Sequence, residues 1–141
     1  MISIRSICVV DGQGGGIGAA IIKRLKSLFE EKVEVVALGT NAIATAQMLK
    51  ARANRGASGE NAIVVTVSQV DIIIGSVGIV MADAMMGEVT PKIAAAIAAA
   101  PARKLLIPIS QENVVIVGAP SVPLPHIVDT LIDEHLSPLL D

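Results

Sequence analysis

The sequence predicts a three-layer α/β fold with a mostly parallel sheet, formed by one domain over residues 1–141. Short apolar runs rich in β-branched residues alternate with stretches whose apolar residues recur every three or four positions, as in strands joined by helices. Several runs show no alternation with polar residues, which indicates strands covered on both faces. Hydrophobic residues make up 52% of the chain and charged residues 17%, which favours a covered sheet, apolar surface buried in an oligomer, or both.

The first half of the chain alternates strand and helix. We expect a strand at residues 6–11, followed by an amphipathic helix that begins at Gly16. A second strand is expected at 32–39, and a second helix at 41–54, where Asn41 can serve as N-cap. Strands joined by helices in this way need right-handed crossovers, so these elements predict the first part of a parallel sheet.

The second half is expected to complete the sheet. The predicted elements are a polar loop at 55–61, a short strand at 62–67, a central strand at 71–77, a helix at 78–88 and an alanine-rich helix at 91–100. Two more strands are expected at 104–110 and 113–119, and their short connection predicts an antiparallel hairpin at one sheet edge. A stiff linker at 120–125 and a terminal helix at 126–136 follow.

Composition excludes several functional classes. The chain has one Phe, no Tyr or Trp, and a net charge of −2, so it offers neither a base-stacking platform nor a basic surface for nucleic acid. Its single cysteine, Cys8, lies in the first apolar run, where we expect a buried thiol. The longest apolar stretch, residues 72–81, is about half a membrane span, and the N-terminus shows no signal-peptide pattern. We therefore expect a cytoplasmic protein that binds neither nucleic acid nor membrane.

Catalytic and metal-binding patterns are absent from the sequence. His126 and His135 are too far apart for a helical metal site, so we expect both at the surface, and no Cys/His cluster is present for zinc. Neither Ser76 nor Ser110 lies in the G-x-S-x-G sequence of a hydrolase nucleophile. The sequence therefore predicts no metal site and assigns no catalytic residue, and it leaves open whether the protein is an enzyme.

The stretch DGQGGGIG is the strongest functional motif. It joins a buried strand to an amphipathic helix, whose N-terminus offers unpaired N–H groups and a partial positive charge. Glycines there let the backbone approach a phosphate, although a tight turn without a ligand is the alternative interpretation. The candidate ligand-binding residues of this loop are Asp11, Gly12, Gln13, Gly14, Gly15, Gly16, Ile17 and Gly18.

Further candidates follow later strands, because ligands bind at the carboxyl ends of parallel strands. Thr40 and Asn41, after the second strand, can hydrogen-bond a ribose or a phosphate. Ser76 and Gly78, after the central strand, would form the opposite wall of the same crevice. Arg55 is either a forked donor to a phosphate or an ordinary solvated residue of a polar loop.

The spacing of Gly12, Gly16 and Gly18 resembles the glycine signature of short-chain dehydrogenases/reductases, in which Thr stands where this chain has Asp11. The resemblance implies NAD(P) or another nucleotide as cofactor. The tyrosine that this family needs for catalysis is missing, and the segment ALGTN, residues 37–41, offers no acid for a ribose. The resemblance therefore favours the turn and not the reductase reaction.

Longer segments, among them GTNAIAT, ANRGA and GEVTP, resemble domain-of-unknown-function family 3842, a family of short bacterial proteins. The resemblance covers nearly the whole chain. It implies a small Rossmann-like domain and brings no established activity with it.

Three functions remain open. The first is a Rossmann-like domain that binds a nucleotide, dinucleotide or other small phosphate-bearing ligand. The second is a non-catalytic homo-oligomeric or regulatory module, with a dimer favoured, which would explain the low charge and the methionines at 81, 85 and 86. The third is a small phospho-ligand enzyme with Asp11 or Glu60 as acid or base.

Overall fold

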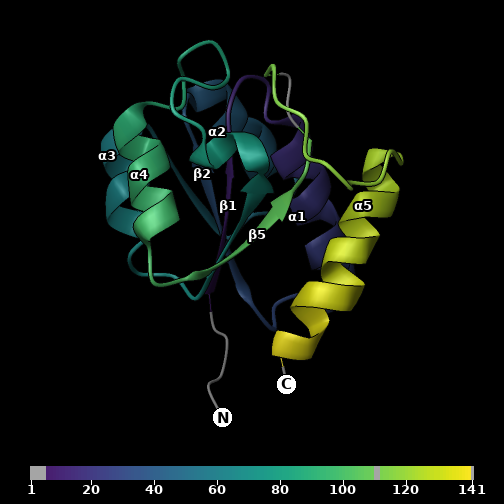
Figure 1. Cartoon of the computed structure of the whole chain (residues 1–141). Helices are drawn as coiled ribbons and strands as arrows, with labels where there is room; N and C mark the ends of the chain where they lie inside the picture. Colours follow the sequence, from purple (N-terminus) through teal and green to yellow (C-terminus); the bar gives the residue numbers. More distant parts are fainter. Residues whose placement is uncertain (1–5, 110–111, 141) are drawn as a thin grey trace.

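The computed structural model describes residues 6–109 and 112–140, which form a five-stranded sheet between two layers of helices (Figure 1). The described strands all pair in parallel, in the order β3-β2-β1-β4-β5. This confirms the predicted α/β fold with a parallel sheet, and the order is that of a Rossmann-like arrangement. The strands are β1 (Ser6–Asp11), β2 (Glu34–Gly39), β3 (Arg55–Ser58), β4 (Ile72–Ser76) and β5 (Arg103–Ile107).

The two faces of the sheet bury separate cores. Alternate residues of β1 point to opposite faces, so Ile7 and Val9 belong to one core while Cys8 and Val10 belong to the other. Helices α1, α2 and α5 cover the first face, and α3 and α4 cover the second (Figure 1). The helices are α1 (Gly16–Phe29), α2 (Ala42–Lys50), α3 (Glu60–Thr66), α4 (Pro91–Ala99) and α5 (Leu124–Thr130), which continues as a π-helical turn over Leu131–Leu136.

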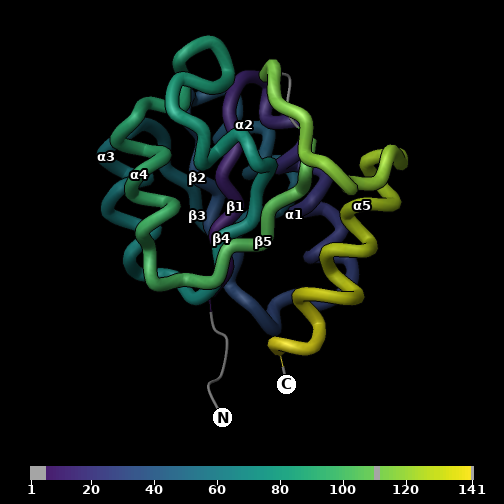
Figure 2. The backbone as a smooth tube through the Cα atoms, viewed as in Figure 1, coloured from purple at the N-terminus to yellow at the C-terminus, as the bar shows by residue number. Residues whose placement is uncertain are grey.

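Central strand β1 marks the point where the chain reverses its direction across the sheet. After β1 the chain moves outward through β2 and β3, and it then returns past β1 to β4 and β5 (Figure 2). β1 pairs with β2 along its whole length and with β4 from Ile7 to Val9. The carboxyl ends of β1 and β4 therefore lie side by side, where ligands bind in open α/β sheets.

Two elements beside β2 differ from the prediction. Residues 55–58, predicted as loop, form edge strand β3, because their backbone pairs with Val36–Gly39 although their side chains are mostly exposed. The strand predicted at 62–67 is helix α3 instead. Its β-branched residues favour a strand by propensity, but Ile63 and Val67, four positions apart, both face the core, and this packing outweighs propensity.

The helix predicted at 78–88 is also wrong. A 3₁₀ turn at Val77–Val80 is followed by a turn segment, residues 81–90. Asp83 and three residues at 85–87 have φ between 57° and 86°, a left-handed conformation that an α-helix cannot contain. The Asp83 N–H donates to the Val89 carbonyl at 2.7 Å, which closes the segment on itself.

The described residues do not form the predicted antiparallel hairpin. Strand β5 ends at Ile107, Ser110 lies outside the described residues, and residues 112–119 contain no strand. The valines and isoleucine at 114–117 favoured a strand by their β propensity, yet Val115 and Val117 are 85% and 93% exposed. Propensity alone does not form a strand when no partner strand lies alongside.

Candidate functional site

A small cavity of about 90 Å³ lies at the carboxyl ends of β1 and β4, the upper end of the sheet in Figure 1. It brings together part of the glycine loop, the end of β4 and residues from two later segments. The residues that line it are Asp11, Gln13, Ile17, Ser76, Gly78, Met85, Ile109 and Glu112. The cavity therefore occupies the crevice at the strand-order reversal.

Asp11 holds the two ends of the glycine loop together. Its Oδ1 accepts a hydrogen bond from the Gly12 N–H and its Oδ2 accepts one from the Gly18 N–H, both at 2.7 Å. The residue is only 5% exposed, and this burial raises the pKa of Asp11, while hydrogen bonds from the loop N–H groups act to lower it. By accepting from the Gly18 N–H, the carboxylate stabilises the first turn of α1. By accepting from the Gly12 N–H as well, it fixes the shape of the loop.

The glycines of the loop fall into two groups. A Cβ at Gly15 would lie 2.7 Å from the Ala44 carbonyl oxygen, and φ at Gly15 is 75°, so the fold itself requires glycine there. A Cβ at Gly14 or Gly16 would meet no described atom within 4 Å, and neither residue has a positive φ. Both are exposed at the N-terminus of α1, where the absence of side chains leaves the backbone open to a ligand.

Ser76 ends β4 and lines the same cavity as Asp11 and Gln13. It is only 4% exposed, and its hydroxyl makes no hydrogen bond with any described residue. No side-chain N or O atom of the described residues is both buried and without a hydrogen-bond partner, so this hydroxyl is open to the cavity and can bond a ligand or a water molecule there.

Glu88 places a carboxylate beside the glycine loop, next to Gln13 but outside the residues that line the cavity. Its Oε1 accepts hydrogen bonds from the Gln13 N–H at 2.8 Å, from the Thr40 hydroxyl at 2.7 Å and from the Asn41 side-chain amide at 2.7 Å. Partial burial acts to raise the pKa of Glu88, but these hydrogen bonds together lower it below its ordinary value. Glu88 is therefore charged at neutral pH and lies where β2 ends.

Sequence reasoning missed Glu88 for two reasons. At least 47 residues separate it from each of its three partners, so no local spacing links them. Its segment also has the composition of a helix, and the sequence GEVTP was the only local indication of a turn before α4. Thr40 and Asn41 do not line the cavity. Both donate to Glu88, and Asn41 also caps α2 by accepting from the Ala44 N–H.

Arg55 and Glu60, two other candidates from the sequence, lie outside this cavity. Arg55 is the first residue of β3 and thus lies at the amino end of its strand, away from the crevice, where it pairs with Glu34 at 3.0 Å. The carboxylate of Glu60, at the start of α3, accepts a hydrogen bond from the Thr90 hydroxyl at 2.6 Å. Neither contact involves the glycine loop.

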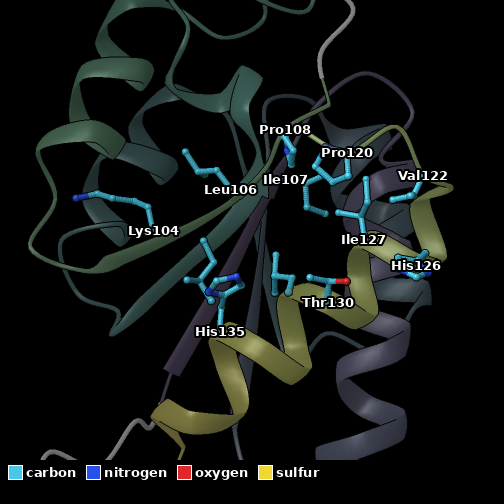
Figure 3. A pocket seen from close by; sticks show the side chains of 12 residues that line it. Lys104, Leu106, Ile107, Pro108, Pro120, Val122, His126, Ile127, Thr130 and His135 are labelled. Carbon is cyan, nitrogen blue, oxygen red and sulfur yellow. The ribbon is translucent and has the colours of Figure 1, made fainter. Parts of the chain in front are cut away.

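A larger cavity of about 430 Å³ lies beside edge strand β5 (Figure 3). It is enclosed by residues 104–108 and by α5 with its π-helical extension, and most of its lining side chains are apolar. His126 and His135 stand at this cavity and are exposed, as the sequence predicts. It shares no lining residue with the crevice at β1 and β4, and we refer to it below as the β5 groove.

Other predictions from the sequence can be compared with the described residues. Cys8 is buried in β1, and burial raises the pKa of its thiol to about 12, so the prediction of a buried thiol is confirmed. No helix in the described part of the chain is long and apolar enough to cross a membrane. Within the same residues, no group of three or more His, Cys, Asp or Glu side chains is arranged to hold a metal ion.

Residues 6–139 match the model of the family described as Domain of unknown function (DUF3842). The chain belongs to this family. No curated protein and no solved structure matches the chain. The family description assigns no reaction.

Proposed function

We propose that this DUF3842 protein binds a nucleotide in the crevice between β1 and β4, with a phosphate group on the N-terminus of α1. The observation that carries the proposal is the pair of exposed glycines, Gly14 and Gly16, for which the fold has no steric need. Backbone N–H groups at the start of a 14-residue helix attract an anion, and glycines let it approach closely. The Ser76 hydroxyl, which makes no hydrogen bond with a described residue, supplies a polar group at the end of β4 in the same cavity.

The size of the cavity indicates how such a ligand would enter. A volume of about 90 Å³ is well below the ~300 Å³ of the smallest typical ligand sites, so a nucleotide needs more room than the crevice now offers. Met85 and Glu112 line the cavity from segments outside the sheet, and the Met85 N–H donates to the Glu112 carboxylate at 2.8 Å. Opening of this contact would widen the crevice without disturbing the strands.

Thermal unfolding with a panel of phosphate ligands tests the proposal. ADP, GDP, NAD⁺, NADP⁺, FMN and a sugar phosphate are each added at millimolar concentration. Because a ligand that binds only the folded state stabilises it, we expect at least one nucleotide to raise Tm by about 5 °C or more. The absence of a shift with every compound would contradict nucleotide binding.

Gly16→Asp separates binding from folding. The new carboxylate would stand in the first turn of α1, where it favours the helix dipole, and no described atom obstructs its Cβ. We expect Tm of the free protein to be unchanged or slightly higher, and the ligand-induced shift to be lost because the carboxylate repels the phosphate. Ala95→Asp, exposed on α4, adds the same charge away from the crevice and is expected to keep the shift.

A second candidate function, a homodimeric assembly module, is favoured by the apolar segment at 114–117. Val115 and Val117 are almost fully exposed, and β5, which pairs only with β4 among the described strands, leaves a sheet edge open nearby. Sedimentation at micromolar concentration is expected to show a dimer that Val115→Glu/Val117→Glu converts to a monomer. A monomeric wild type would remove this candidate.

A further inference from the structure

Hydrogen bonds hold the carboxylate of Glu88 in place through only one of its two oxygens. All three of its described hydrogen bonds go to Oε1, from the Gln13 N–H and from the side chains of Thr40 and Asn41. No described residue donates to Oε2. Glu88 is partly exposed and lies beside Gln13, which lines the cavity, so its Oε2 can accept from a group bound along the glycine loop.

Several features of the chain keep Glu88 at this position. Segment 81–90 is closed by the Asp83–Val89 hydrogen bond and contains left-handed, non-glycine residues at Met85 and Met86. Such residues are strained and are retained where surrounding contacts hold them. Gly12 also packs closely against this carboxylate, because a Cβ at position 12 would lie 2.5 Å from the Thr40 hydroxyl and 3.1 Å from Glu88 Oε1.

The location of Glu88 indicates what its free oxygen would accept. Rossmann-type domains place an acid at the end of the second strand, where it takes a hydrogen bond from a ribose hydroxyl. In this chain the residues after β2 are Thr40 and Asn41, which are neutral and donate to Glu88. The acid that β2 lacks is thus supplied by a segment that follows β4, about 50 residues later in the chain.

The carboxylate that lines the cavity from the end of β1, Asp11, does not have this capacity. Both oxygens of Asp11 accept short hydrogen bonds from loop N–H groups, and the residue is 5% exposed. Glu88 therefore combines a fixed position, a negative charge and an oxygen that accepts from no described residue.

We infer that Glu88 accepts a hydrogen bond from the 2′-hydroxyl of the bound nucleotide, so that the site selects ribonucleotides whose 2′-position is not phosphorylated. This inference rests on the nucleotide binding proposed above. A 2′-deoxyribose would leave Oε2 without a partner, and a 2′-phosphate would bring two negative charges together. The hydrogen bonds that Oε1 already accepts let Glu88 remain in place when the ligand binds.

Calorimetric titration with ADP, 2′-deoxy-ADP and adenosine 2′,5′-bisphosphate tests the inference on the wild type, on Glu88→Gln and on Glu134→Gln. Glu134 is an exposed carboxylate on the extension of α5 and provides the matched control. We expect the wild type and Glu134→Gln to bind ADP about 10- to 100-fold more tightly than 2′-deoxy-ADP, as for a hydrogen bond to a charged group. In Glu88→Gln this ratio should fall to about threefold or less, and binding of the bisphosphate should improve.

Each other outcome overturns a defined statement. Equal affinity of the wild type for ADP and 2′-deoxy-ADP overturns the role of Glu88 and leaves nucleotide binding intact. Tighter binding of ADP by Glu88→Gln than by the wild type also overturns the role of Glu88 and leaves nucleotide binding intact. It would show that the carboxylate repels the ligand and does not accept a hydrogen bond from it. If the wild type binds none of the three compounds while the nucleotide panel fails as well, nucleotide binding itself is overturned. The wild-type comparison needs no variant, so a folding defect in Glu88→Gln does not affect it.

Discussion

Gly15→Ala is expected to lower the free energy of unfolding by about 3 kcal/mol, whereas Gly14→Ala, one residue earlier, should change it by less than about 1 kcal/mol. Alanine at position 15 would have to adopt a φ of 75° and bring its Cβ to 2.7 Å from the Ala44 carbonyl oxygen. At position 14 the Cβ would meet no described atom within 4 Å. Urea unfolding followed by circular dichroism measures both values.

The contrast between these neighbouring glycines is the physical basis of the ligand argument. If Gly14→Ala destabilised the protein as much as Gly15→Ala, glycine at position 14 would be explained by folding alone. A small effect at position 14 would leave the approach of a ligand as the reason for an open backbone at this point.

Asp11→Ala is expected to lower the free energy of unfolding by about 3 kcal/mol as well. The change leaves the N–H groups of Gly12 and Gly18 without their acceptor, and each unpaired buried group costs about 1–3 kcal/mol. Asp129→Ala is the matched control, because its ion pair with Arg24 is about half exposed and should contribute less than about 1 kcal/mol. A loss of stability no larger for Asp11→Ala than for Asp129→Ala would show that Asp11 does not hold the loop together.

The start of the fold could be predicted because local sequence determines it. The unbroken apolar run of β1 and the helical spacing that begins at Gly16 each depend on the side chains of that element alone. β3 could not be predicted in the same way, since its mostly exposed side chains resemble those of a loop and its strand conformation depends on pairing with β2. The β-branched residues of α3 show the opposite case, in which tertiary packing overrides a strand propensity.

The candidate site shows the same division. The glycine loop and Ser76 could be located from the rule that ligands bind at the carboxyl ends of parallel strands. The position of Arg55 could not be predicted, because the sequence does not reveal that β3 begins with this residue and so holds it away from the cavity. Glu88 could not be found because its position depends on a left-handed turn and on partners from two distant parts of the chain.

The most direct test of nucleotide binding at the glycine loop is a map of amide chemical shifts in ¹⁵N-labelled protein titrated with ADP. The largest changes are expected at the N–H groups of Gly14, Gly16 and Ile17, with a smaller change at Ser76 across the cavity. Absence of changes at these amides, or changes confined to residues 104–108 of the β5 groove, would contradict the proposed site.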